Sequence, residues 1–181
     1  MIKVLICPCE SIEKQSALAR NMLFSELREE FSLPETEIKK TADGKPYFEE
    51  KGYPAFSISH TAGAVCVAIF DGAGSIGADI EKCSERLLNK RLTDRFFPGL
   101  TKADNSVSDI EIKVRGEVYD AEPEKALFTL GEAVIKCDGR GFSAAGEAYE
   151  LIRKMKTSSF KIILSGEEYA LSVAVLIDEE I

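Results

Sequence analysis

The sequence feature that most constrains the fold is the stretch 76–81, which reads Ile-Gly-Ala-Asp-Ile-Glu. Apolar residues alternate with other residues at a period of two, which predicts a strand with one apolar face. That face consists of Ile76, Ala78 and Ile80. On the other face Asp79 and Glu81 are about 7 Å apart at their backbones, close enough for both carboxylates to reach one hard cation. The alternative for this face is plain exposure to solvent.

Length and charge exclude several classes of protein. A chain of 181 residues suits one compact domain or two small halves, and 45% hydrophobic with 30% charged residues is typical of a globular protein. A net charge of −8 argues against nucleic-acid binding through a basic surface. No apolar run is long enough to span a membrane, and residues 1–10 do not form a secretory signal. We therefore expect a cytoplasmic protein with no nucleic-acid or membrane partner.

The cysteines do not indicate a disulfide framework or a zinc site. They are odd in number, irregularly spaced and mostly within apolar patterns, so we interpret them as reduced core residues. They are Cys7, Cys9, Cys66, Cys83 and Cys137. The Cys7-Pro8-Cys9 stretch has no second cysteine pair and only one histidine in the chain to recruit, which disfavours zinc.

Residues 72–77 match the G-x-G-x-x-G pattern of dinucleotide-binding sites letter for letter. That pattern requires a helix directly after the glycines and an acidic residue about 20 positions later. Here the glycines lead from the turn Asp71-Gly72, which we expect to form a hairpin, into the predicted strand with Asp79. We therefore reject a Rossmann site.

Periodicity predicts the remaining elements. A helix is expected over 11–31, a half-buried strand over 56–61 that ends near the only histidine, His60, and an apolar strand over 64–70. Further helices are expected over 84–97 and 124–138, and a possible hairpin over 110–118. In the last helix Glu132 and Lys136 are one turn apart and off the apolar stripe, where an exposed ion pair is the simplest interpretation.

An internal sequence repeat suggests two related halves. Residues 160–166 followed by 170–176 resemble 56–63 followed by 65–70, since each reads as strand, tight turn and apolar strand. We therefore predict two pseudo-symmetric halves, 1–92 and 93–181, each with a helix on a small, mainly antiparallel sheet. The fold class is α+β, and a ligand site is expected between the halves.

Several motifs in order resemble those of the 4′-phosphopantetheinyl transferases, of the surfactin-synthetase-activating type with two fused halves. The motifs are Gly44-Lys45-Pro46, Phe56-Ser57-Ile58-Ser59-His60, the stretch 76–81, Phe96-Phe97, and the stretch 128–136 that contains Glu132 and Lys136. Their order and spacing over residues 44 to 142 carry the resemblance.

The resemblance implies a function. Members of that family transfer the phosphopantetheine arm of coenzyme A to a serine of an apo carrier protein, with magnesium, and release adenosine 3′,5′-bisphosphate. The carriers serve fatty-acid, polyketide or nonribosomal peptide synthesis. A monomer with the site between its halves would be sufficient.

The resemblance also implies roles for individual residues. Asp79, Glu81 and Glu132 would hold Mg²⁺, and Glu132 would take the serine proton directly or through a water. Lys136 would contact phosphate. The remaining coenzyme A contacts would be Lys45, Ser59, His60 and Arg20.

Departures from the family pattern keep alternatives open. Gly131 stands where the family has a lysine, and residues 99–126 do not resemble the usual carrier-facing region. The main alternative is a degenerate relative that binds coenzyme A or a carrier without catalysis, and a third possibility is a magnesium-dependent diphosphate hydrolase. Residues 86–91 could be a basic surface for a carrier or simply an exposed helix.

Overall fold

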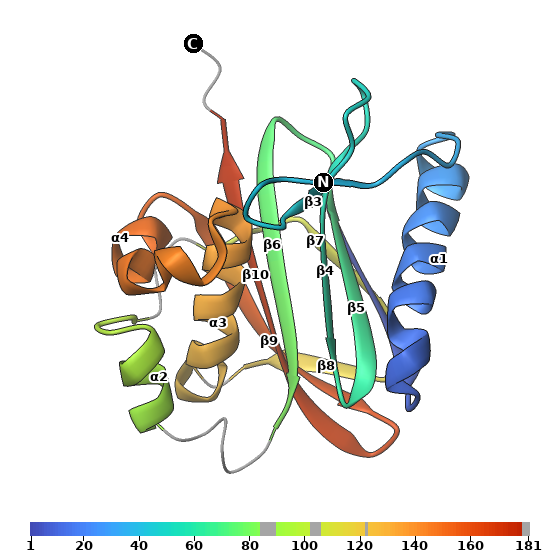
Figure 1. Cartoon of the computed structure of the whole chain (residues 1–181). Coiled ribbons are helices and arrows are strands. Elements are labelled where there is room, and N and C mark those ends of the chain that lie inside the picture. Colours follow the sequence, from blue (N-terminus) through green and yellow to red (C-terminus); the bar gives the residue numbers. More distant parts are fainter. Residues whose placement is uncertain (84–89, 102–105, 122, 179–181) are drawn as a thin grey trace.

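The computed structural model describes residues 1–83, 90–101, 106–121 and 123–178 of the chain (Figure 1). The fold is α+β, as predicted, with mainly antiparallel sheets. In these ranges no helix is long and apolar enough to cross a membrane.

Two four-stranded sheets form the centre of the molecule. The first has the order β4-β5-β1-β7, with bounds Ala55–Thr61, Gly63–Phe70, Ile2–Cys9 and Ile110–Val114. The second has the order β6-β10-β9-β8, with bounds Gly74–Lys82, Glu167–Ile177, Lys156–Leu164 and Glu117–Asp120. Neighbouring strands are antiparallel except β1 and β7, which are parallel. β2 (Lys39–Lys40) and β3 (Pro46–Tyr47) form a separate two-stranded sheet.

The two sheets pack face to face and each carries helices on its outer side (Figure 1). Helix α1 (Ile12–Glu30) buries Leu23 and Leu27 against the outer face of the first sheet. Helix α3 (Pro123–Asp138) covers the outer face of the second sheet together with α4 (Ala148–Ile152) and a 3-10 helix, η1 (Gly141–Glu147). The short helix α2 (Lys90–Phe96) lies beside α3. The alternation of apolar residues along the strands produces this arrangement of layers.

Each sheet combines strands from the N-terminal and the C-terminal parts of the sequence. β6 belongs to the second sheet, where it pairs with β10, whereas β7 extends the first sheet beside β1. The two stretches that echo each other in sequence form the hairpins β4–β5 and β9–β10, one in each sheet. The division into halves 1–92 and 93–181 stays a prediction.

Two local expectations differ from the structure, and two helices can be compared with it. Asp71-Gly72 does turn the chain, but β5 and β6 on either side lie in different sheets and form no hairpin. The run 110–118 likewise divides into β7 and β8, one in each sheet. Of the helix expected over 84–97, the part from Lys90 onward is α2, and residues 84–89 lie outside the described residues. The helix expected over 124–138 is confirmed as α3, and Gly139, whose φ is +94°, directly follows its last residue.

Candidate functional site

The face of β6 that carries Asp79 is covered by α3. Asp79 is only 3% exposed, so the alternative of plain exposure to solvent is wrong at this residue. Gly77 explains the close approach, since a Cβ there would overlap the carbonyl oxygen of Ala133 and the backbone nitrogen of Cys137. A glycine in this strand therefore lets the helix lie directly over the carboxylate.

Lys136 on α3 forms an ion pair with Asp79. Its Nζ lies 2.6 Å from Asp79 Oδ1 and also donates to Ser59 Oγ at 3.1 Å. The exposed Glu132–Lys136 pair that the helix spacing suggested does not form, because the ammonium reaches β6 instead. Asp79 Oδ2 is buried and has no hydrogen-bond partner among the described residues. A buried carboxylate oxygen without a partner is costly, and it marks a place where a further positive group fits.

Two more carboxylates lie within electrostatic reach of Asp79. Burial, and then the negative charge of Asp79, raise the pKa of Glu132 from its ordinary 4.5 to about 7. Burial also raises the pKa of Glu81, and the charge of Asp79 adds to this rise. The Glu81 carboxylate accepts a hydrogen bond of 2.7 Å from Thr61 Oγ1. Three acids of β6 and α3 therefore interact electrostatically with one another and with Lys136.

The chemistry of this donor set suits magnesium. Within the described ranges no group of three or more His, Cys, Asp or Glu side chains is arranged so that it could hold a metal ion without other ligands. However, all three donors are carboxylates, and one buried oxygen lacks a partner among the described residues. Burial first, and then repulsion between the acids, raises the pKa values of Glu132 and Glu81. Mg²⁺ is normally held by one or two carboxylates together with substrate phosphate and water, so a partial protein ligand set fits this ion.

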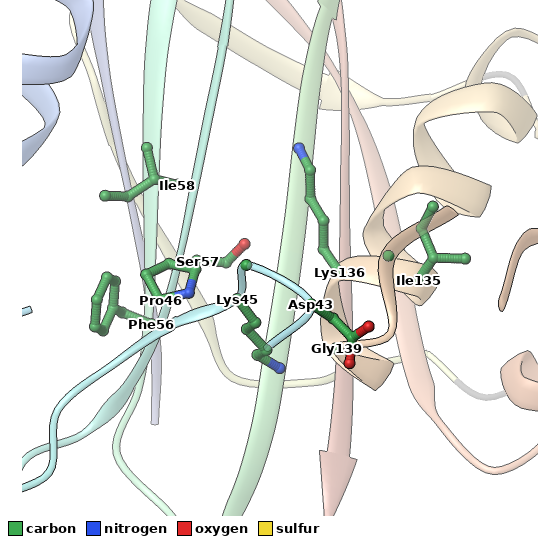
Figure 2. Close-up of a pocket in the computed structure, with 11 residues that line it drawn as sticks. Asp43, Lys45, Pro46, Phe56, Ser57, Ile58, Ile135, Lys136 and Gly139 are labelled. Carbon is green, nitrogen blue, oxygen red and sulfur yellow. The ribbon is translucent and has the colours of Figure 1, made fainter. Parts of the chain in front are cut away.

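A cavity of about 230 Å³ is lined in part by Lys136, the lysine that binds Asp79 (Figure 2). It is bounded by the loop before β3, by β4 and by the C-terminal part of α3. Its lining includes Gly44, Lys45, Ser57, Lys136 and Gly139. Figure 2 shows Lys45 and Pro46 on the loop side and Ile135 and Lys136 on the helix side. Because Lys136 both lines the cavity and binds Asp79, a ligand in the cavity would adjoin the acidic group.

Lys45 reaches from the loop to the end of α3. Its Nζ donates to the carbonyl oxygen of Cys137 at 2.6 Å and to Ser75 Oγ. Burial lowers the pKa of this lysine. An ammonium at the C-terminal end of a helix satisfies an unpaired carbonyl and opposes the helix dipole. Lys45 therefore ties the Gly44-Lys45-Pro46 loop to the helix that carries Glu132.

The remaining predicted residues are Ser59, His60 and Arg20, and they differ in how they interact with the carboxylates. Ser59 is buried and donates to Asp79 Oδ1 at 2.8 Å. His60 is exposed on β4, and an electrostatic interaction with it lowers the pKa of Glu81. Arg20 lies on α1, where it contacts Glu35 and the ring of Phe24. Since α1 covers the outer face of the other sheet, Arg20 is not brought together with the acidic group (Figure 1).

Sequence reasoning missed three contributors to this region. Thr61 and Ser75 hydrogen-bond Glu81 and Lys45, and Gly77 admits the helix. Hydroxyl residues at alternate positions of the strand ending at Thr61, and a glycine inside a strand, were the available signals. Scans of protein-family models and of curated proteins find no match to this chain.

Proposed function

We propose that this protein is a magnesium-dependent 4′-phosphopantetheinyl transferase that acts on a serine of an apo carrier protein. The observation that carries the proposal is the buried ion pair of Asp79 and Lys136, with two further carboxylates beside it and a cavity adjoining it. These are the side chains to which the sequence resemblance assigns the reaction. The hairpins β4–β5 and β9–β10 support, by the same resemblance, a fold of two pseudo-symmetric halves with the site between them.

In this proposal Asp79, Glu81 and Glu132 would hold Mg²⁺. When bound, the ion would neutralise the diphosphate of coenzyme A and stabilise the charge of the leaving group. Asp79 Oδ2 supplies the buried oxygen that lacks a partner in the part of the chain that the structure describes.

The chain's own residues supply the proton transfer and part of the electrostatic stabilisation. Glu132 would accept the proton of the carrier serine, directly or through a water. Lys136 would stabilise the negative charge that grows on the phosphate oxygens as the serine attacks phosphorus. It extends along the cavity wall to Asp79, so one side chain links the ligand cavity to the acids.

Lys45, Ser59 and His60 would contact coenzyme A in this proposal, with Arg20 the remaining assigned cation. The cavity of about 230 Å³ is smaller than typical pockets for whole cofactors, so it would enclose only part of coenzyme A. Burial lowers the pKa of Lys45, and a phosphate beside it would favour the charged form again.

Intact mass spectrometry tests the function. Apo carrier proteins of the fatty-acid, polyketide and peptide-synthetase types are incubated with the protein, coenzyme A and Mg²⁺, with and without a chelator. A magnesium-dependent gain of one phosphopantetheine arm is expected in at least one carrier, and it should disappear with Asp79→Ala or Glu132→Gln. Glu150→Gln on the exposed side of α4 is the matched control and should retain transfer. Full transfer by both site variants would exclude this assignment of residues.

One observation favours a second candidate, a relative that binds coenzyme A without catalysis. The position at which the family has a lysine is Gly131, and the ring of Phe97 fills the space beside it. One cation is therefore lacking next to Lys136, which is itself engaged by Asp79. This candidate predicts coenzyme A binding by calorimetry, with no release of adenosine 3′,5′-bisphosphate with any carrier. Release of bisphosphate without a carrier would instead indicate a hydrolase.

A further inference from the structure

The edges of the two sheets meet along β4 and β6 without a backbone ladder. Instead, three hydroxyl side chains of β4 accept hydrogen bonds from alternate N–H groups of β6. The pairs are Ser57 with Ala78 at 3.0 Å, Ser59 with Ile80 at 3.3 Å, and Thr61 with Lys82 at 3.5 Å. We refer to Ser57, Ser59 and Thr61 as the hydroxyl row.

Two of these three hydroxyl groups also donate to carboxylates of β6. Ser59 Oγ donates to Asp79 Oδ1 at 2.8 Å, and Thr61 Oγ1 donates to Glu81 Oε2 at 2.7 Å. In each pair the hydroxyl accepts the N–H of one residue of β6 and donates to the carboxylate of the residue directly before it. Ser59 thus contacts Ile80 and Asp79, and Thr61 contacts Lys82 and Glu81. At Ser57 the corresponding residue is Gly77, which has no side chain to receive the proton.

This double use fixes the direction of each hydroxyl proton. A hydroxyl oxygen accepts the strand N–H through a lone pair and still has one proton to donate. The contacts of 2.8 and 2.7 Å place that proton toward the neighbouring carboxylate. The carboxylate is thereby held in one orientation relative to the strand that carries it. For Asp79, Ser59 and Lys136 both bind Oδ1, and the buried Oδ2 remains without a partner among the described residues.

We propose that Ser59 and Thr61 are positioning residues that hold Asp79 and Glu81 for a divalent cation. The inference rests on the cation site of the proposed function, but not on transfer to a carrier. Groups that hydrogen-bond a metal-ligating side chain fix its orientation, and their loss typically weakens metal affinity 10- to 100-fold. Thr61 gives the clearer test, because Ser59 also accepts a hydrogen bond from Lys136.

The test measures Mn²⁺ binding to the full chain, by the loss of the free-ion electron paramagnetic resonance signal and by calorimetry. Thr61→Val keeps the shape of the side chain and removes the hydroxyl, so its affinity should fall about tenfold. Thr61→Ser restores the hydroxyl and should return affinity to the wild-type value. Ser57→Ala is the matched control: it removes one N–H acceptor from the same row but no bond to a carboxylate, so Mn²⁺ affinity should not change.

Thermal unfolding of each variant separates positioning from folding. Thr61→Val and Ser57→Ala each remove one acceptor from the row, so both should lower the melting temperature while only Thr61→Val loses Mn²⁺ affinity. Equal Mn²⁺ affinity in wild type and Thr61→Val would overturn the inference and leave the transferase proposal intact. An absence of Mn²⁺ binding to the wild type would overturn both the inference and the cation site. If the variants show the expected Mn²⁺ affinities but the wild type transfers no phosphopantetheine to any carrier, the inference is supported and the transferase proposal is contradicted.

Discussion

The ring of Phe97 occupies the space that a side chain at Gly131 would need. A Cβ placed on Gly131 would lie within 2.7 Å of three ring atoms of Phe97. Phe97 is 1% exposed and belongs to the cluster between α3 and the second sheet. Glycine inside a helix costs about 1 kcal/mol relative to alanine, so packing explains why it is found here.

We predict that Gly131→Ala destabilises the protein although alanine is the better helix former. The added methyl group must displace a buried ring, which typically costs about 1–3 kcal/mol. Urea unfolding measures the change, and Gly131→Ala with Phe97→Leu should recover part of it. Gly146→Ala is the control, because a Cβ there meets no atom within 4 Å. Higher stability of Gly131→Ala than wild type would contradict this packing. Replacement by lysine at this position would displace the same ring.

Removal of the Lys136 charge should leave Asp79 as an uncompensated buried carboxylate. We expect Lys136→Met to lower the free energy of unfolding by about 3 kcal/mol, and Mg²⁺ to stabilise this variant more than it stabilises wild type. Thermal unfolding with and without Mg²⁺ measures both effects. Lys154→Met, at an exposed position, is the control. A Lys136 variant that behaves like the Lys154 variant would mean that the ion pair contributes nothing.

Glu132 should make stability depend on pH in a defined direction. Its pKa in the folded protein is about 7 against an ordinary 4.5, so the folded state binds the proton more tightly than the unfolded state. This contribution to stability is complete below pH 4.5 and is lost as the pH rises through 7. Glu132→Gln should therefore gain stability relative to wild type between pH 5 and 8, measured by urea unfolding in a chelator. Glu150→Gln should give a constant difference over that range.

Lys45 should contribute to stability through the end of α3. Loss of its ammonium in Lys45→Met leaves the Cys137 carbonyl without this donor, and we expect a loss of about 1 kcal/mol. Calorimetry on the same variant measures coenzyme A affinity, which should also fall if Lys45 meets phosphate. Lys40→Met on the exposed side of β2 is the control for both measurements. Unchanged stability would show that the contact with Cys137 is not formed in solution.

Strand periodicity was sufficient to predict which residues of β6 enter the core. Ile76, Ala78 and Ile80 are fully buried between the sheets, because alternate side chains of a strand must point to the same side. The same reasoning could not show what covers the opposite face, since that depends on a helix more than forty residues later in the chain. It also could not show that β5 and β6 separate into different sheets.

The acids and the lysine were identified from the sequence, but their partners were not. Spacing within a helix relates Glu132 only to Lys136, whereas the folded chain brings Lys136 to Asp79 and leaves Glu132 half-buried. Contacts between distant segments depend on packing, which local periodicity does not contain. Arg20 illustrates the same limit, because position along a helix gave no information about which sheet that helix would cover.

The pairing of β6 with β10 has a consequence for protein synthesis. The backbone partner of Asp79 is Ser172 in β10, about ninety residues later, so a ribosome delivers the acidic strand long before the strand that completes its sheet. A nascent chain that ends before β10 would contain every residue of the candidate site and yet lack the neighbour that holds β6 in the second sheet. Products of termination before β10 should therefore lack an assembled candidate site and be vulnerable to proteolysis.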